Sequence, residues 1–453
     1  MSSHASIGPD LAALTHALLT AAKRAGAAEA DALAVSGRSQ SIDIRAGRLE
    51  QAERSEAVEI GLRVLIGGRQ ACVSASDISP TTIERLAERA VAMAREAPED
   101  PTVGLAEPGQ LAQGWDLAFY EMQDSTPEPN AAALEADARA AEAGAMATKG
   151  ITQVEASAGY SARKMHLAAS NGFSGGYGRT GRSISAVAFT GEGTAMERDW
   201  SGESRVFQAD MPDALGIGAE AALRALSRAG ATKPVTGSYP VLFDERIAAS
   251  LIGHLLSAVN GAAVARGASW LRDALGQQVL PSQLSVIEDP HRPRISGSRP
   301  FDGEGLPTQR RAIVENGILT GWTLDLASGR KLGMASTANA SRGTGAPPSP
   351  STSNIDLTAG AVTRENLIRD MGTGLLVTSM IGATINPTTG DYSRGASGFW
   401  VEGGEIRHPV NECTIAGNLR DMLLRIIPAN DSRPHLSTRV PSLLVEGMTL
   451  AGS

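Results

Sequence analysis

A chain of 453 residues is too long for one ordinary hydrophobic core, so two or three domains are expected. Hydrophobic residues make up 42% and charged residues 20%, which is typical of a soluble globular protein. The net charge is −8 without a basic stripe, which disfavours nucleic-acid binding. No apolar run is long enough to span a bilayer, and the N-terminus lacks the pattern of a signal peptide. Cys72 and Cys413 form no CxxC pair, so we expect no disulfide framework and a reducing, cytoplasmic setting.

The first predicted domain covers residues 1–105. Residues 10–25 have the apolar periodicity of a helix, which Gly26 can close. Alternating apolar and polar residues follow, and Ser79 with Pro80 then predicts the start of a second helix. Turns between antiparallel strands are expected at the glycines of the alternating stretch: Gly37, Gly47 and Gly67–Gly68.

Two further domains are predicted after an acidic, proline-rich linker at residues 96–110. The central domain, residues 111–233, reads as helix, strands and helix. The C-terminal domain, residues 234–453, is rich in glycine, with hairpins expected at Asn316–Gly317 and Gly403–Gly404. The predicted fold class is α+β, with mostly antiparallel sheets, flanking helices and a β-dominated C-terminal domain.

A helix containing the run ASLIGH, residues 249–254, is apolar around most of its circumference. A stripe of small or polar residues on this helix carries Ser250, His254 and Ser257. A zinc site normally needs three or more protein ligands, and this helix offers one. The other six histidines show no ligand spacing, so His254 is interpreted as a hydrogen-bonded structural residue.

Acidic residues in two glycine-rich segments are the remaining candidates for chemistry. Asp302 and Glu304 lie in FDGEG, where paired carboxylates can bind a cation, transfer protons or simply build a turn. Asp391 and Arg394 lie in NPTTGDYSRG, which matches no phosphate-binding or dinucleotide motif. We favour turns for both segments, with an Asp391–Arg394 contact in the second. The chain has no GxSxG nucleophile motif.

Several long segments resemble the TldD/PmbA family, in the right order along nearly the entire chain. These are the meander IDIRAGRLEQAERSEAVEIGLRVL, RPFDGEGLPTQRRAIVENGILTGWTLD at 299–325, MGTGLLVTSMIG at 371–382, GDYSRGASGFWVEGGEIRHPVNECTIAGNLRDML at 390–423 and LLVEGMTLAG at 443–452. The run GDYSRGASGFWVE resembles the PmbA branch, also called TldE, rather than the TldD branch.

The resemblance implies a role in proteolysis. TldD resembles a zinc metallopeptidase whose ligands come from an HExxxH helix and a later cysteine, and PmbA/TldE is its partner subunit. Together they are expected to degrade unfolded peptides and to trim the leader peptides of modified precursors. For this chain the resemblance therefore implies a TldD-like partner in a heterodimer, or a second copy in a homodimer, with no nucleic acid and no membrane involved.

Carried over to this sequence, the HExxxH motif falls on ASLIGH. Ala249 stands at the first histidine, Ser250 at the glutamate and His254 at the second histidine. Two such histidines lie about 140° apart on a regular helix, so a working site needs a distorted turn, for which Gly253 is suited. The C-terminal region has no cysteine at the expected place, and Cys413 does not match it. The resemblance thus implies a degenerate metal site, with no metal on this chain and zinc on the partner.

The residues leave other functions open. Residues expected to face a peptide chamber are His254, Asp391, Tyr392 and Arg394. One alternative is a homodimeric regulatory protein that binds peptides by pairing with a strand edge and does not cleave them. Another is a hydrolase that uses an unrecognised carboxylate site around Asp302, Glu304 and Asp391.

Overall fold

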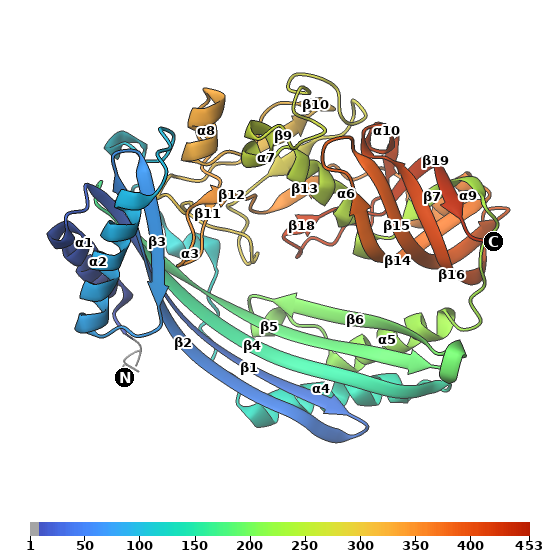
Figure 1. Cartoon of the computed structure of the whole chain (residues 1–453). Helices are drawn as coiled ribbons and strands as arrows, with labels where there is room; N and C mark the ends of the chain where they lie inside the picture. The colour runs from blue at the N-terminus through green and yellow to red at the C-terminus, as the bar shows by residue number, and fades with distance from the viewer. Residues whose placement is uncertain (1–8) are drawn as a thin grey trace.

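The computed structural model describes residues 9–453 (Figure 1). The predictions about a signal peptide and about the first residues of the 1–105 domain therefore concern a segment that lies partly outside the described residues. No helix among residues 9–453 is long and apolar enough to cross a membrane. The predicted fold class is confirmed, because helices flank sheets that are mostly antiparallel.

The N-terminal segment is a helix, a three-stranded meander and a second helix. Asp10 caps the first helix, Gly26 ends it in the left-handed conformation, and Ser79 caps the second helix ahead of Pro80. The strands turn at Ala46–Gly47 and at Gly67–Gly68. The elements are α1 (Leu11–Ala25), β1 (Glu29–Arg45), β2 (Arg48–Ile66), β3 (Arg69–Ala75) and α2 (Pro80–Glu96).

The expected turn at Gly37 is wrong. Gly37 lies inside β1 and pairs with Ala57 on one side and with Arg163 on the other. Its φ lies outside the left-handed region that a tight hairpin turn requires. β1 and β2 therefore form one long hairpin, where the sequence had suggested two short ones.

The central segment repeats this order with strands of similar length. Its elements are α3 (Leu117–Tyr120), α4 (Ala131–Met146), β4 (Ile151–Ala169), β5 (Ser174–Thr190), β6 (Glu197–Arg205) and α5 (Ala214–Ser227). Asn130 and Asp213 cap the two long helices. Both helices pack their alanine-rich faces against the sheet, where Ala138, Ala141 and Ala221 are fully buried.

The N-terminal and central strands form one sheet, in the order β3-β2-β1-β4-β5-β6. Side chains alternate between its two faces. On β1, Ala30, Ala32 and Ala34 pack toward α1 and α2, whereas Leu33 and Val35 belong to a different cluster on the opposite face. Figure 1 shows that this opposite face is the concave one and looks toward the C-terminal part of the chain.

The C-terminal part contains a β-barrel. Its sheet has the order β16-β15-β14-β7-β19-β17, and the pairing of β16 with β19 closes it. One pair in it, β7 with β14, is parallel. The strands are β7 (Gly237–Phe243), β14 (Gly374–Ile385), β15 (Asp391–Glu402), β16 (Glu405–Asn418), β17 (Ile426–Pro428) and β19 (Leu443–Ala451).

Short elements complete this part of the chain. Both predicted hairpins are confirmed, at Asn316–Gly317 and at Gly403–Gly404. The helices are α6 (Glu245–Ala258), α7 (Gly261–Ala265), α8 (Leu326–Leu332), α9 (Arg364–Met371) and α10 (Leu419–Leu423). The strands are β8 (Val286–Glu288), β9 (Arg311–Glu315), β10 (Ile318–Leu319), β11 (Ala340–Ser341), β12 (Ser349–Pro350), β13 (Ile355–Leu357) and β18 (Thr438–Arg439).

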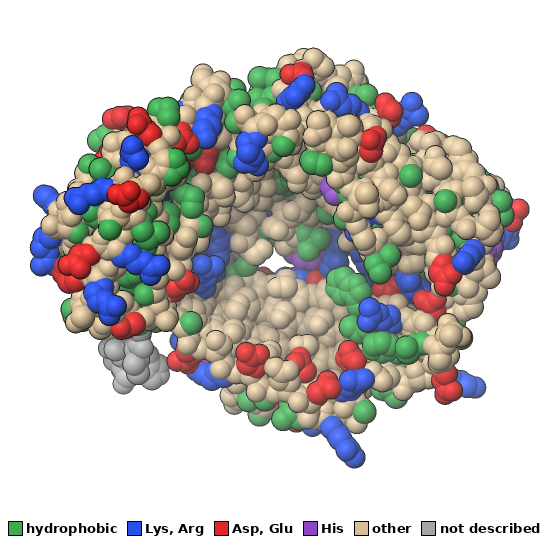
Figure 2. All heavy atoms as spheres, in the orientation of Figure 1, with side chains coloured by type: hydrophobic (Ala, Val, Ile, Leu, Met, Phe, Trp, Pro, Cys, Tyr) green, Lys and Arg blue, Asp and Glu red, His purple; other side chains and the backbone are tan. Residues whose placement is uncertain are grey.

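The molecule is arranged around a hollow. Figure 2 shows this hollow between the curved sheet and the C-terminal part. Apolar contact between the two occurs where Phe301 packs with Leu33, Leu167 and Phe173 of the sheet region. At β6 the contact is polar: Arg246 donates to Asp199 over 3.1 Å, and Asn411 donates to Glu197 over 2.7 Å.

Candidate functional site

The helix α6 carries the residues at the expected metal-site positions. Asp244 caps it by accepting a hydrogen bond from the Arg246 N–H over 3.2 Å. Its apolar face is part of the largest core, with Leu251, Ile252 and Leu255 fully buried. Those side chains fix the helix against the barrel, so the positions between them have a defined orientation.

The opposite side of α6 is half-buried and holds Ala249, Ser250, Gly253 and His254. The helix stays α-helical through Gly253, so no distorted turn occurs here. Ser250 Oγ and His254 Nε2 are both shielded from solvent and have no hydrogen-bond partner among residues 9–453. His254 Nε2 therefore makes no hydrogen bond, contrary to the interpretation of this histidine from the sequence.

An aromatic side chain covers His254. The ring of Tyr392 on β15 meets the imidazole edge-on, with 5.8 Å between the ring centroids. Burial lowers the pKa of His254, and the nearby Arg394 lowers it further, so the neutral imidazole is favoured. Burial also raises the pKa of Tyr392 to about 12, and its hydroxyl donates to the Met380 sulfur over 3.3 Å. Both rings are thus uncharged at neutral pH.

Asp391 and Arg394 do not contact each other, which corrects the expected turn contact. Asp391 is exposed and accepts hydrogen bonds from Thr389 Oγ1 over 2.6 Å and from Asn418 Nδ2 over 3.1 Å. Those bonds lower its pKa. Arg394 donates instead to the main-chain oxygen of Gly382 over 2.7 Å. Of the predicted chamber residues, the structure brings together His254, Tyr392 and Arg394 and leaves Asp391 at the strand end.

The residues on α6 do not fit a zinc ion. Among the three positions, only His254 offers a ligating atom, because Ala249 has none and a neutral Ser250 hydroxyl is not a usual zinc ligand. Cys413 lies buried on β16, where its thiol donates to the Ala396 oxygen over 3.2 Å and burial raises its pKa to about 11. Residues 9–453 contain no group of three or more His, Cys, Asp and Glu side chains placed to hold a metal.

Asp302 and Glu304 are buried in a turn, as favoured from the sequence. Asp302 accepts main-chain hydrogen bonds from Glu304, Leu306 and Ala340, all between 2.9 and 3.0 Å. Glu304 accepts one from Leu326 over 2.9 Å, and burial followed by repulsion from Asp302 raises its pKa to about 8. Asp391 is exposed at the start of β15, and residues 9–453 contain no group of three or more acidic, His or Cys side chains close enough to share a metal ion. The three carboxylates therefore do not form a common site.

Sequence reasoning missed a cluster of buried charges. Asp31 on β1 and Arg63 on β2 form a buried ion pair, and Arg342 from the C-terminal part donates to the same carboxylate. The neighbouring guanidinium groups lower the pKa of Asp31 despite its burial. Arg342 lies 311 positions from Asp31 along the chain, and the three residues share no motif, so only the fold reveals the cluster.

The structure thus defines a class: an α+β protein with a closed barrel, whose helix α6 carries one histidine where a metal site would need several ligands. Comparison with known families then supplies the family. The model described as "PmbA/TldA metallopeptidase domain 1" matches residues 30–94, the central-domain model matches 124–229, and the C-terminal-domain model matches 236–452. The chain belongs to the PmbA/TldD family of metallopeptidases.

Individual relatives agree with this assignment. The chain is 37% identical to Metalloprotease PmbA of Escherichia coli O157:H7, over 91% of this chain and 90% of that protein. A crystal structure titled as a putative modulator of DNA gyrase, from Bacteroides thetaiotaomicron, has a TM-score of 0.90 and 27% identity over 97% of this chain and 98% of its own. TldE from Thermococcus kodakarensis shares the fold, with a TM-score of 0.83 and 20% identity over 96% of this chain and 99% of its own.

Proposed function

We propose that this chain is the PmbA/TldE-type subunit of a two-protein metallopeptidase that degrades unfolded peptides and trims leader peptides. In this proposal the zinc ion belongs to a TldD-like partner, and this chain shapes the chamber in which the peptide is bound. The observation that carries the proposal is the pair Ala249 and Ser250 on α6, at the positions of a ligand and of the general base.

The chemistry of peptide hydrolysis at zinc explains why this pair matters. Zinc lowers the pKa of a bound water, and a nearby carboxylate takes the proton that the water releases. The methyl group of Ala249 cannot bind a metal, and the Ser250 hydroxyl cannot act as that base. His254 alone cannot fix an ion, and the described residues offer no replacement ligands. The fold is retained while the means of activating water are lost.

The concave face of the curved sheet supports a role in shaping a chamber. Small residues lie in register across three neighbouring strands: Ser41 on β1 faces Gly159 on β4, and Gly159 faces Ser183 on β5. Ser39 and Ser161 pair in the next row on that face. These residues are exposed or half-buried although they lie mid-sheet. A polar floor with short side chains leaves room for an extended peptide and does not favour collapse of the hollow.

Reconstitution tests the proposal. The purified chain is mixed with the TldD-like protein of the same cells, and cleavage of an unfolded peptide is followed with and without a zinc chelator. Chelator-sensitive cleavage is expected from the mixture and not from this chain alone, and the two proteins should co-elute in size-exclusion chromatography.

A His254→Gln variant of this chain is the internal control. Because His254 does not take part in activating water in this proposal, the mixture that contains the variant should keep chelator-sensitive cleavage. Equal cleavage by the partner without this chain, together with separate elution, would rule out the subunit role. Zinc-dependent cleavage by this chain alone would rule out the non-catalytic assignment.

A further inference from the structure

The part of β2 that lies nearest its turn with β1 has an open edge. β2 runs from Arg48 to Ile66, but β3 pairs only with the residues from Ile60 to Ile66. Residues 48–59 therefore pair with β1 on one side and, within the described chain, with no strand on the other. Figure 1 shows this part of the β1–β2 hairpin extending past the end of β3. All of these residues except Val58 are exposed, so nothing in residues 9–453 covers the edge.

Main-chain groups along this edge are free to form hydrogen bonds. The two-residue turn at Gly67–Gly68 makes Ile66 and Arg69 a hydrogen-bonded pair, so the even-numbered residues of β2 direct their N–H and C=O groups toward β3. The same series continues past the end of β3, because β2 keeps a regular register with β1 there. It consists of Ala52, Arg54, Glu56 and Val58, whose outward groups have no main-chain partner among residues 9–453. Such an unpaired row is a template for an added strand.

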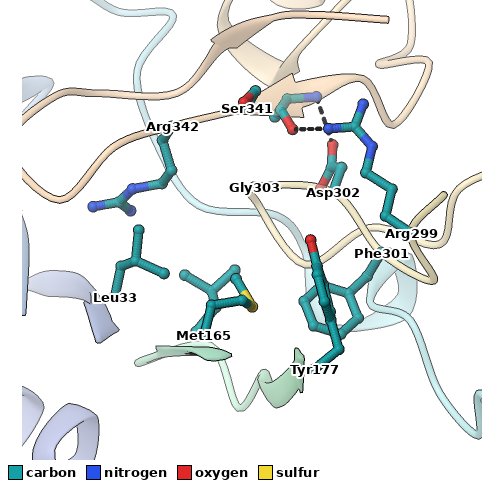
Figure 3. A pocket seen from close by; sticks show the side chains of 11 residues that line it. Leu33, Met165, Tyr177, Arg299, Phe301, Asp302, Gly303, Ser341 and Arg342 are labelled. Atoms are coloured by element: carbon teal, nitrogen blue, oxygen red, sulfur yellow. Dashed lines mark hydrogen bonds between the residues drawn. The ribbon is translucent and has the colours of Figure 1, made fainter. Parts of the chain in front are cut away.

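The other end of the concave face is closed by the chain itself. Figure 3 shows Leu33 of β1 and Met165 of β4 close to Phe301 and Arg342 of the C-terminal part. A cavity of only about 70 Å³ remains between them. A chain segment from outside can therefore reach β2 along residues 48–59, and not where the sheet meets the C-terminal part.

Two acidic side chains on the concave side of the open edge have no counter-charge. Glu59 lies opposite Val35, which packs on the concave face, and Glu53 shares that face because side chains alternate. Both are exposed, and no basic side chain among residues 9–453 pairs with either carboxylate. Arg163, an exposed base on this face, belongs to β4 and is separated from β2 by β1. The concave side of this edge is therefore acidic.

The charges on comparable surfaces are balanced. On the convex side of the same edge, Arg54 pairs with Glu56 over 2.6 Å and with Glu128 over 3.3 Å. On β6, the strand at the other end of the sheet, Glu203 pairs with Arg433 of the C-terminal part. Uncompensated acidic charge thus distinguishes the concave side of the β2 edge from these two surfaces.

A strand added along β2 would bring its alternate side chains beside Glu53 and Glu59. Directly opposed residues on neighbouring strands have Cβ atoms about 4.5–5.5 Å apart, so opposite charges attract and like charges repel there. The two acids lie six positions apart, with the small residues Ser55 and Ala57 between them on the same face. A segment with basic residues at this spacing matches the edge, whereas an acidic segment is repelled.

We propose that the open edge of β2, from Gln51 to Glu59, binds an extended basic peptide as an additional strand. Main-chain hydrogen bonds hold the peptide, and basic side chains opposite Glu53 and Glu59 select it. The added strand widens the floor of the hollow at its rim. The proposal rests on the proposed function only in taking this peptide to be an unfolded substrate, because the binding itself needs no second protein.

Fluorescence anisotropy with labelled peptides and the purified chain tests the proposal. The probe is a nine-residue peptide of threonine and valine with lysine at its second and eighth positions. A second peptide has glutamate at both positions, and a third has the side chains of the probe on an N-methylated backbone. The lysine peptide should bind at low salt, and the glutamate peptide at least about tenfold more weakly. The N-methylated peptide should not bind, because it cannot form the hydrogen bonds of a strand.

Variants of β2 separate the two parts of the site. The double variant Glu53→Gln with Glu59→Gln should bind the lysine and glutamate peptides alike. Glu56→Gln is the matched control on the opposite face of the same strand and should keep the preference for lysine. Glu56→Pro removes an outward N–H that the ladder with β1 does not use, so it should abolish binding while melting near the temperature of Glu56→Gln.

Four results would overturn the proposal. They are no binding of the lysine peptide to the parent chain, equal binding of its N-methylated form, equal loss of preference in Glu56→Gln and the double variant, and a parent dimer that becomes a monomer in Glu56→Pro. The last would show that a second copy fills the edge. Reconstituted cleavage without peptide binding to this chain would remove the edge site and keep the subunit role. Peptide binding without reconstitution would do the reverse.

Discussion

Ser250 and His254 lie one helical turn apart, and each keeps a shielded polar atom without a partner in the described chain. A buried polar atom that lacks its hydrogen bond costs about 1–3 kcal/mol. A helix that served only to fill the core would be more stable with apolar residues there. The two residues therefore indicate that this side of α6 is not optimised for stability alone.

At the residue scale, replacing Ala249→His and Ser250→Glu together should not give this chain peptidase activity by itself. The pair supplies a ligand and a base, but a third ligand is still missing, since Cys413 is buried on β16 and bonded to Ala396. Chelator-sensitive hydrolysis of an unfolded peptide by the purified double variant is the measurement. Robust cleavage would show that a further ligand exists. The single Ala249→His variant controls for effects of metal binding alone.

His254 should give the chain a pH-dependent stability. Its pKa is lower in the folded state than in the unfolded state, so unfolded chains bind more protons and stability falls as pH falls. The loss should begin near the ordinary histidine pKa of about 6.5 and continue down through the lowered value. Denaturant unfolding between pH 8 and pH 5 should show a shallower loss for His254→Gln. His408 is exposed, so the matched variant His408→Gln measures the effect of losing any histidine. Equal slopes of stability against pH for the two variants would contradict a special contribution from His254.

At the scale of elements, the strands show how much the sequence could predict. The helix end at Gly26, the helix cap at Ser79 and the hairpins at Asn316–Gly317 and Gly403–Gly404 are local features, and local rules predicted them. Gly37 was misread as a turn because a glycine within a strand and a glycine in a turn look alike without knowledge of φ. The family resemblance found α6, whereas the buried cluster of Asp31, Arg63 and Arg342 depends on contacts between distant segments and stayed hidden.

Gly61 on β2 is the clearest test of such a distant contact. A Cβ atom there would lie 2.1 Å from the main-chain oxygen of Thr344, two residues after Arg342. Gly61→Ala should therefore destabilise the chain by about 1–3 kcal/mol through overpacking. Gly37→Ala is the matched control, since nothing lies within 4 Å of its added Cβ; it should be neutral or stabilising by up to about 1 kcal/mol. Urea unfolding of the two variants gives their free energies of unfolding. Equal changes in both would show that β2 and the segment around Thr344 do not approach as closely as described.

At the scale of the whole molecule, the curved sheet meets the C-terminal part through two different kinds of contact. Apolar packing joins them around Phe301. Near β6 no apolar cluster of residues 9–453 bridges the two, and polar pairs do so instead. Glu203 accepts from Arg433 and lies 3.2 Å from His435 Nε2. Partly exposed charge pairs weaken with salt, whereas apolar contacts do not.

Opening of the molecule should therefore begin at β6. Glu203→Gln removes the charge that binds Arg433, so amide hydrogen exchange should quicken in β6 and in residues 431–439. High salt should have the same effect on the parent chain. Glu56→Gln, which breaks the exposed pair with Arg54 within one sheet, is the control and should leave both segments unchanged. Unchanged exchange in Glu203→Gln would place the weak point elsewhere.

The pairing of β1 with β4 has a consequence for how the chain can be divided. The two strands are joined by continuous register from Asp31↔Ala169 to Arg45↔Glu155, although they come from segments that match separate family models. After a single proteolytic cut in the connecting residues 97–130, the two fragments would stay together through the hydrogen bonds between β1 and β4. A fragment that stops at residue 105 would instead bare the whole outer edge of β1, which invites pairing with other chains. A fragment meant to keep this sheet intact therefore has to contain both the N-terminal and the central segments.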